Sequence, residues 1–349
     1  ADGASRILID PNTWSEDGTV ALAEWAASPD GAVVAFATQD SGSDWRTIRV
    51  INTSTGETLD DTVEWARFTT IAWHPDGSGF YYSRFPEPEA GAAFSAGVEG
   101  HAVYFHRLGS HRSEDQLIHA ATAGQALLHS VDVTPDGRYL IVYTSALTGG
   151  VAVTVTDLSS ADPAPDTIIE SYDDRWLLLG NVGTKLFFAP QKDAPRGRIV
   201  TMDLSEAQPG FSEMIPERPD AVLREGGSAM LGDRLLLSYT IDVQSQAELY
   251  NLDGTFEGTV PLPGPGSTGI VRGRPGANEA FFAFTSFDAP LTVLRLDVDA
   301  NRTTVWAEPE IATDLESRSS RIFTPRRTAR GCHSLLFGAK TLTVRRRQC

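Results

Sequence analysis

The stretch AASPDGAVVAFA, residues 26–37, decides the fold because its pattern returns twice further along the chain. AWHPDGSGFYYS (72–83) and DVTPDGRYLIVY (132–143) show the same order of a short strand, a Pro-Asp-Gly turn and a strand of alternating apolar residues. Proline presets φ for a turn, and aspartate and glycine tolerate the conformations that close a hairpin. Each copy therefore predicts a β-hairpin.

The repeated unit is longer than one hairpin. Three weaker copies keep the paired strands but replace the turn: LLLGNVGTKLFFA (177–189), SAMLGDRLLLSYT (228–240) and VRGRPGANEAFFAFT (271–285). Each unit continues into a further alternating strand that ends near an acidic turn, for example VAVTVTDLSS (151–160). A copy spans roughly 40 to 60 residues and holds about four short strands without an amphipathic helix, the pattern of a β-propeller with one blade per copy. A β-sandwich would not repeat one turn at blade spacing.

The predicted fold class is therefore all-β, a β-propeller of four-stranded blades. Six complete blades are predicted to begin near Ala21, Arg67, Leu128, Asp173, Ala221 and Gly266. Ahead of them, SRILIDPN (5–12) is interpreted as the last strand of a partial first blade. We expect a propeller domain over residues 1–312 and an atypical basic tail over residues 313–349.

The charge of the chain is negative and unevenly distributed. The formal net charge is −17, from 29 basic and 46 acidic residues. Residues 313–349 hold nine basic and two acidic residues, a charge of +7, so the rest of the chain carries 20 basic and 44 acidic residues, a charge of −24. This balance argues against nucleic acid or an anionic membrane surface as a partner. No apolar run approaches the length of about 18 residues that a membrane span needs.

The motifs of common catalytic and metal sites are absent from the sequence. It contains no G-x-S-x-G, so the nucleophile elbow of an α/β-hydrolase is missing, and neither H-E-x-x-H nor C-x-x-C, so we expect no zinc site and no cofactor. Five histidines fall close together: His101, His106, His111, His119 and His129. Their spacing places them on different strands and turns, which favours ordinary surface and core histidines. Both cysteines lie in the tail, so cytoplasm and periplasm both remain open as compartments.

An ordered series of motifs resembles a known family. LIDPNTWSEDGTVAL (8–22), SGSDWRTIRV (41–50) and FTTIAWHPDGSGFYYSRFP (68–86) resemble the propeller domain of the prolyl oligopeptidase family of serine peptidases, and later segments are similar over 101–118 and 281–298. In that family a seven-bladed propeller caps an α/β-hydrolase domain, which carries the catalytic Ser, Asp and His. The propeller restricts entry to short peptides.

The resemblance implies functions for residues in the second and third of these motifs. Asp44 matches a family aspartate that faces the hydrolase domain and pairs with an arginine holding the substrate backbone. Phe68 matches a phenylalanine lining the pocket for a residue upstream of the scissile proline. Trp45 follows Asp44 in the same turn and is assigned with it to the interdomain contact that positions the substrate. The alternatives are a simple hairpin turn at residues 41–45, with Trp45 anchoring the next strand, and inter-blade core for Phe68. The chain departs from the family at residues 143–152, where many relatives have an arginine.

The tail after Phe323 has two interpretations. A family member would enter the hydrolase domain here with a Lys-Asp-Gly-Thr segment. Codons can be chosen for residues 325–340 so that a neighbouring reading frame gives SKDGTRVPLFIVRRK, which favours a frame shift and a poorly ordered tail. The alternative is a genuine extension in which CHSLLFGA and KTLTVRRR form strands that pair with SRILID and complete the first blade.

Three functions are compatible with these sequence features. The resemblance favours the substrate-gating portion of a serine endopeptidase that cleaves short peptides after proline, with the hydrolase domain and short proline-containing peptides as partners. This chain holds no catalytic triad, so it is expected to be inactive alone. The alternatives are a stand-alone propeller that binds a peptide or protein, and a degenerate gene product without a retained role.

Overall fold

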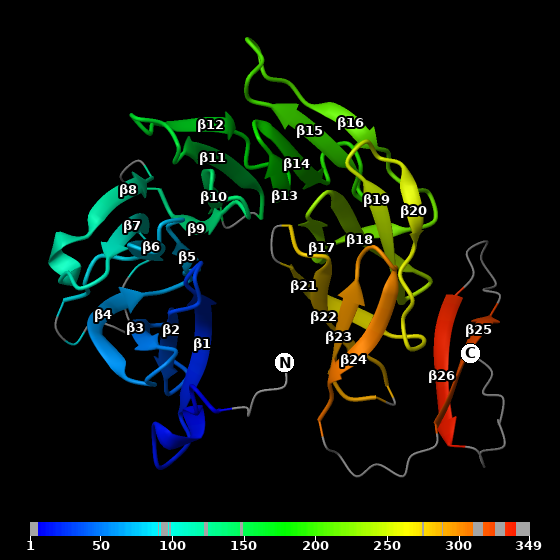
Figure 1. The fold of residues 1–349 in the computed structure, drawn as a ribbon, viewed down its shortest axis with the longest axis horizontal. Helices are drawn as coiled ribbons and strands as arrows, with labels where there is room; N and C mark the ends of the chain where they lie inside the picture. The colour runs from blue at the N-terminus through cyan, green and yellow to red at the C-terminus, as the bar shows by residue number, and fades with distance from the viewer. Residues whose placement is uncertain are drawn as a thin grey trace. The chain divides into compact units, whose positions relative to one another are not determined.

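The structure is a computed structural model that describes residues 6–89, 91, 97, 99–121, 125–146, 149–273, 276–287 and 289–309, together with the backbone of 317–324 and 332–339. The side chain of residue 225 is also outside the description. The chain divides into two compact units, residues 1–176 (unit 1) and 177–349 (unit 2). In both, nearly all of the described regular secondary structure is antiparallel β-strand (Figure 1). In the described residues, no helix has the length and apolar character needed to cross a membrane.

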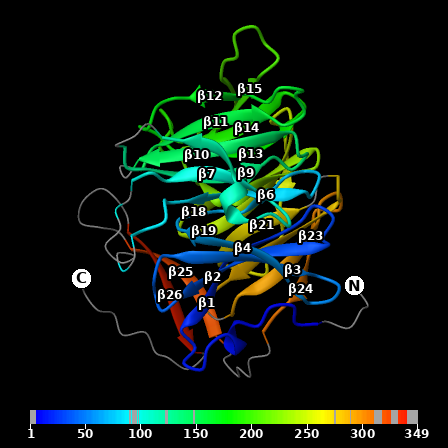
Figure 2. The same cartoon turned by 90° about the vertical axis from the view of Figure 1, so that its left-hand side faces the viewer.

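Unit 1 contains three antiparallel meanders. The first consists of β1 (Val20–Ala27), β2 (Val33–Asp40), β3 (Arg46–Asn52) and β4 (Thr58–Ala66), which are the blue strands of Figures 1 and 2. The second consists of β5 (Ala72–Trp73), β6 (Gly79–Arg84), β7 (Ala102–Arg107) and β8 (Gln116–Ala120), and the third of β9 (Leu127–Val133), β10 (Tyr139–Ala146), β11 (Val151–Asp157) and β12 (Pro165–Ile169). One backbone pairing, Ala66 with Arg84, joins the first two meanders into a single sheet. Two short 3-10 helices, η1 (Pro11–Thr13) and η2 (Arg112–Glu114), lie outside the strands.

Unit 2 repeats the same construction. In the described residues up to 309, it contains three meanders. The first consists of β13 (Trp176–Val182), β14 (Lys185–Pro190), β15 (Ile199–Asp203) and β16 (Ser212–Ile215). The second consists of β17 (Val222–Leu231), β18 (Arg234–Ile241), β19 (Gln244–Asn251) and β20 (Phe256–Thr259), and the third of β21 (Ser267–Gly273), β22 (Glu279–Thr285), β23 (Thr292–Asp297) and β24 (Arg302–Ala307). The six four-stranded meanders of the two units are the six predicted blades. The largest difference between a predicted and an observed start is at the second blade, predicted at Arg67 and beginning at Ala72. The all-β propeller prediction is confirmed.

The Pro-Asp-Gly turns close hairpins as their residues predict. Gly31, Gly77 and Gly137 have φ of 72°, 73° and 76°, a region that glycine enters without strain. In the first turn the Gly31 N–H donates to the Ser28 carbonyl at 2.9 Å, and a carboxylate oxygen of Asp30 accepts from the Ser28 hydroxyl at 2.6 Å. Each turn is therefore specified by local chemistry, which explains why the repeat was visible in the sequence.

The blades of unit 1 pack through apolar faces and one buried polar network. Residues of the first two blades share a core that includes Ile48, Val63, Trp73 and Phe80. Beside it the fully buried His106 of β7 lies between two carboxylates, 2.7 Å from Asp115 and 3.1 Å from Asp61 of β4. The Tyr82 hydroxyl donates to the other oxygen of Asp115 at 2.6 Å, and the Gly109 N–H donates to Asp61 at 2.6 Å. This network connects the outermost strand of one blade to the next blade.

The prediction of a strand at residues 5–12 is wrong for the part that the structure describes. Residues 6–10 pair with no strand there, and η1 follows them. Leu8 and Ile9 instead pack against a small cluster that contains Phe36 of β2 and Ile51 of β3. The apolar alternation reflects this burial, because an extended segment can bury side chains on a sheet face without forming a sheet ladder.

In the tail the structure describes two strands. β25 (Ser317–Thr324) and β26 (Cys332–Ala339) pair antiparallel with each other, Ser317 opposite Ala339. CHSLLFGA thus forms a strand, but its described partner is β25 rather than residues 6–10. KTLTVRRR and the expected poorly ordered end of the tail lie outside the described residues.

Candidate functional site

The first blade presents two loops at the same end. Successive strands of a meander reverse direction, so the β2–β3 turn and the β4–β5 connection lie together, opposite the Pro-Asp-Gly turn between β1 and β2. The β2–β3 turn carries Asp44 and Trp45, and the β4–β5 connection carries Arg67 and Phe68. The topology therefore brings together the three residues that the sequence singled out, with Arg67 between them.

Arg67 is the centre of this group. Its Nη2 lies 3.0 Å from Oδ2 of Asp44, and its guanidinium carbon lies 4.8 Å from the ring centroid of Phe68 and 5.3 Å from that of Trp45. The Phe85 ring lies at 5.9 Å. Only 17% of the Arg67 side chain is exposed, against 52% of Asp44. A planar guanidinium can stack on aromatic rings and bind a carboxylate at once, so Arg67 holds both loops in place.

The aromatic rings around Arg67 contact one another by their edges. Trp45 meets Trp65 at 5.6 Å with an interplanar angle of 87°, and Phe85 at 6.1 Å with an angle of 85°. Edge-to-face pairs are a favoured arrangement of aromatic quadrupoles. Trp45 is thus packed on several sides, whereas Phe68 is 40% exposed and offers its ring to solvent. The structure does not place Phe68 in a buried inter-blade core.

Backbone strain is concentrated at the same end of the blade, in the two loops and at the end of β4. Ser41, Trp65 and Phe68 have φ of 51°, 64° and 53°. Bulky side chains rarely adopt this left-handed region, and each such residue costs about 1–3 kcal/mol unless the surroundings hold it. Such outliers are typical of binding and switch sites, so the strain supports a functional assignment of this end of the blade.

A buried histidine holds the backbone of the β4–β5 connection at Arg67 through a hydrogen bond. The Nδ1 atom of His101 accepts the backbone N–H of His129 at 2.8 Å, so its Nε2 carries the proton and donates to the Arg67 carbonyl oxygen at 2.9 Å. Burial lowers the pKa of His101 to about 4, so the imidazole is neutral near pH 7. Burial and the neighbouring His119 and His101 lower the pKa of His129 to about 3. His101 therefore acts as a fixed hydrogen-bond donor.

Sequence reasoning did not identify Arg67, Trp65, Phe85 or His101 as part of this site. The five histidines do lie on different elements as predicted, yet His101, His119 and His129 meet in one cluster, with ring centroids 5.0 Å apart for His119 and His129 and 5.7 Å for His101 and His129. Within the described ranges no three His, Cys, Asp or Glu side chains are arranged to hold a metal ion. The cluster around Arg67 offers an exposed carboxylate and an exposed ring, which suit binding rather than bond cleavage.

Comparison with known proteins identifies the class of this protein as a β-propeller domain of the kind found in a family of peptidases. Residues 1–309 match the family model described as the prolyl oligopeptidase N-terminal beta-propeller domain. The chain belongs to this family. The resemblance seen in the motifs is thereby confirmed.

Individual relatives agree with the family match. The prolyl endopeptidase of Elizabethkingia miricola is 30% identical over 91% of this chain and 44% of its own length, and prolyl oligopeptidase A of Amanita bisporigera is 29% identical over 88% of this chain and 43% of its own. A solved structure from a structural and mechanistic study of two prolyl endopeptidases is similar with a TM-score of 0.84 and 34% identity, covering 96% of this chain and 47% of the other. Prolyl oligopeptidase B from Galerina marginata shares the fold, with a TM-score of 0.85 at 22% identity over 96% of this chain and 49% of its own. The chain thus spans less than half the length of these relatives.

Proposed function

We propose that this chain is the substrate-gating propeller portion of a serine endopeptidase that cleaves short peptides after proline. In this proposal an α/β-hydrolase domain supplies the Ser, His and Asp of the catalytic triad, and the propeller domain covers residues 1–312. The family membership and the shared names of the relatives support it. The observation that carries it is the Arg67 cluster, which holds an exposed carboxylate and an exposed aromatic ring at one end of a blade.

Each predicted residue has a proposed role. Asp44 is proposed to form the polar contact to the hydrolase domain, because more than half of its side chain is exposed and one of its carboxylate oxygens is not used by Arg67. Phe68 is proposed to contact an apolar substrate side chain, because its ring is exposed and stacked on a cation that fixes its orientation. Trp45 is proposed to position both through its contacts with Arg67 and Trp65.

The test has two steps. The source DNA is first sequenced beyond the codon for Phe323, where a neighbouring frame that continues into G-x-S-x-G with downstream Asp and His would identify the matching hydrolase domain and support the frame-shift interpretation. That domain, or the hydrolase half of the Elizabethkingia miricola enzyme, is then mixed with the purified chain. Association and a restored preference for short proline-containing peptides over long ones are expected.

Matched variants sharpen the second step. Asp44→Asn is expected to weaken association about 10-fold, while Asp60→Asn, an exposed carboxylate at the opposite end of β4, is expected to leave it unchanged. Phe68→Ala is expected to raise KM for proline peptides with little effect on association. A folded chain that fails to associate with either hydrolase domain would contradict the proposal and favour the stand-alone binding platform. A chain that aggregates or does not fold would favour the degenerate gene product.

A stand-alone platform is supported by one feature of unit 2. A pocket of about 230 Å³ there is lined by Val243, Phe287 and neighbouring uncharged residues. Phe287 is 76% exposed, and Val243, a β-branched residue, has φ of 62°. A pulldown that recovers one specific protein through this surface, lost in Phe287→Ala, would favour this second function.

A further inference from the structure

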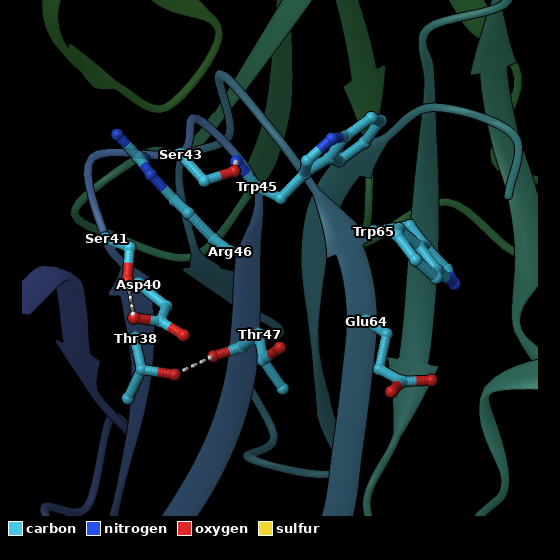
Figure 3. Close-up of a pocket in the computed structure, with 9 residues that line it drawn as sticks. All are labelled: Thr38, Asp40, Ser41, Ser43, Trp45, Arg46, Thr47, Glu64 and Trp65. Atoms are coloured by element: carbon cyan, nitrogen blue, oxygen red, sulfur yellow. Dashed lines mark hydrogen bonds between the residues drawn. The ribbon is translucent and has the colours of Figure 1, made fainter. Parts of the chain in front are cut away.

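The first blade also has a pocket, which is separate from the exposed ring of Phe68. Figure 3 shows this pocket of about 370 Å³, formed by β2, the β2–β3 turn, β3 and β4. Asp40 stands on one side, Glu64 and Trp65 on the other, and Trp45 above them. The pocket therefore combines two carboxylates with two indole rings.

A β-bulge builds the wall that carries Glu64 and Trp65. Arg46 pairs with Ala66 and Ile48 pairs with Val63, so two residues of β4 stand opposite the single residue Thr47 of β3. Neighbouring residues of a regular strand point to opposite faces, but Trp65 has φ of 64°, and the bulge lets Glu64 and Trp65 line the same hollow. Holding a tryptophan in this conformation costs about 1–3 kcal/mol. Bulges of this kind re-aim side chains next to binding sites.

The charges around the pocket are not balanced. Among the described residues Glu64 makes neither a hydrogen bond nor an ion pair, and it is exposed. Asp40 accepts only uncharged donors, the Ser41 hydroxyl at 2.6 Å and the Thr19 hydroxyl at 3.4 Å. The cation of the lining, Arg46, donates to the Thr69 carbonyl at 3.2 Å, and Figure 3 shows its side chain extending away from Glu64. The pocket thus has excess negative charge in a chain whose net charge is −17.

The aromatic wall adds to this preference. The faces of indole rings attract cations, most strongly among the aromatic side chains. Arg67 already lies over the Trp45 ring at 5.3 Å, which shows that this ring accommodates a guanidinium. In the part of the chain that the structure describes, no cation lies over the ring of Trp65. An anionic or purely apolar ligand would leave the negative charges of Asp40 and Glu64 without a counter-charge.

We propose that the pocket between Trp65, Glu64 and Asp40 binds a cationic group of a peptide, the ammonium of lysine or an amino terminus or the guanidinium of arginine. That the peptide is a substrate of the peptidase rests on the proposed function. The binding of the cationic group itself needs only this chain. Together with the exposed Phe68 on the same loops, the pocket would favour proline peptides that also carry a basic residue.

The experiment is a calorimetric titration of the purified chain with acetyl-Gly-Lys-Gly-Pro-amide and with its twin in which norleucine replaces lysine. The lysine peptide is expected to bind about 10-fold more tightly, with an affinity that falls as salt rises. Glu64→Gln is expected to weaken the lysine peptide about 5-fold and leave the norleucine peptide unchanged, and since Glu64 has no partner the variant keeps the fold. Glu57→Gln, exposed at the opposite end of the blade, is the matched control.

Three results would overturn the inference. They are equal affinities for the two peptides, equal effects of Glu64→Gln and Glu57→Gln, and no binding of the lysine peptide at millimolar concentration. None of them bears on the association with the hydrolase domain, because no hydrolase domain is present in the titration. Conversely, a failed association with a normal lysine preference would contradict the proposed function alone.

Discussion

Replacing His106 with glutamine should destabilise unit 1 strongly. His106 is fully buried between Asp115 at 2.7 Å and Asp61 at 3.1 Å, so its removal leaves at least one buried carboxylate without its cation. Breaking a buried ion pair at one partner costs about 3–5 kcal/mol. Asp61 keeps the Gly109 N–H and Asp115 keeps the Tyr82 hydroxyl, so we expect the lower end, about 3 kcal/mol.

Urea unfolding followed by tryptophan fluorescence measures this loss. Five of the seven tryptophans precede β13 and lie in unit 1, so the signal reports mainly on unit 1. With a urea m value of about 2 kcal/mol/M, the unfolding midpoint of His106→Gln should fall by roughly 1.5 M. The control is His111→Asn, an exposed 3-10 cap in which asparagine retains the capping acceptor, and it should shift the midpoint little.

The pH dependence of this loss has a definite sign. Burial alone would lower the pKa of His106, but hydrogen bonds and charges from Asp115 and then Asp61 outweigh it and raise the pKa above its ordinary value. A group with a raised folded pKa stabilises fully below its unfolded pKa of about 6.5 and loses that contribution as pH rises through the folded value. The gap between wild type and His106→Gln should therefore be larger at pH 6 than at pH 9. A gap below about 1 kcal/mol, or one that grows with pH, would refute the buried imidazolium.

Three further predictions concern other sites. Phe68→Gly should be more stable than Phe68→Ala by about 1 kcal/mol in urea unfolding, because only glycine adopts φ near 53° without strain. Lowering pH from 7 to 4 should destabilise unit 1. Burial lowers the folded pKa values of His101 and His129 to about 4 and 3, so over this range these histidines take up protons in the unfolded chain before they do in the folded one. A urea midpoint that stays constant over this range would contradict the prediction. Glu248→Gln should cost about 2 kcal/mol, because Glu248 is buried 2.8 Å from Arg218, and faster hydrogen exchange of β19 amides is the readout.

The sequence predicted those features that local chemistry specifies. A Pro-Asp-Gly turn needs only its own residues, and Gly31 and Gly77 have the positive φ that such a turn requires. The strand expected at residues 5–12 failed for a different reason. An alternation of apolar residues indicates which side chains are buried, not whether the backbone pairs with a strand. In residues 6–10, Leu8 and Ile9 are partly buried against Phe36 and Ile51, but the segment pairs with no strand.

The site was predictable only in part because it is built from departures from regular structure. Asp44, Trp45 and Phe68 were identified through a resemblance between motifs. Arg67 adjoins Phe68 in sequence, but its role depends on contacts with a turn 23 residues away. The bulge at Trp65 adds one residue to β4, and an alternating pattern of side chains does not reveal which residue is additional.

The backbone strain at Trp65 and Phe68 and the hydrogen bond from His101 act on the same segment of chain. Trp65 and Phe68 hold unfavourable backbone conformations that together cost about 2–6 kcal/mol if each costs about 1–3 kcal/mol. The fold offsets this cost with the ion pair of Arg67 to Asp44, the rings stacked on its guanidinium, and the hydrogen bond from neutral His101 to its carbonyl. Because Asp44 is half exposed to solvent, its pair with Arg67 contributes at most about 1 kcal/mol, so most of the offset comes from the ring contacts and the hydrogen bond from His101. A loop held this rigidly loses little entropy when a ligand binds, which is the advantage that would justify keeping two strained aromatic residues beside an exposed carboxylate.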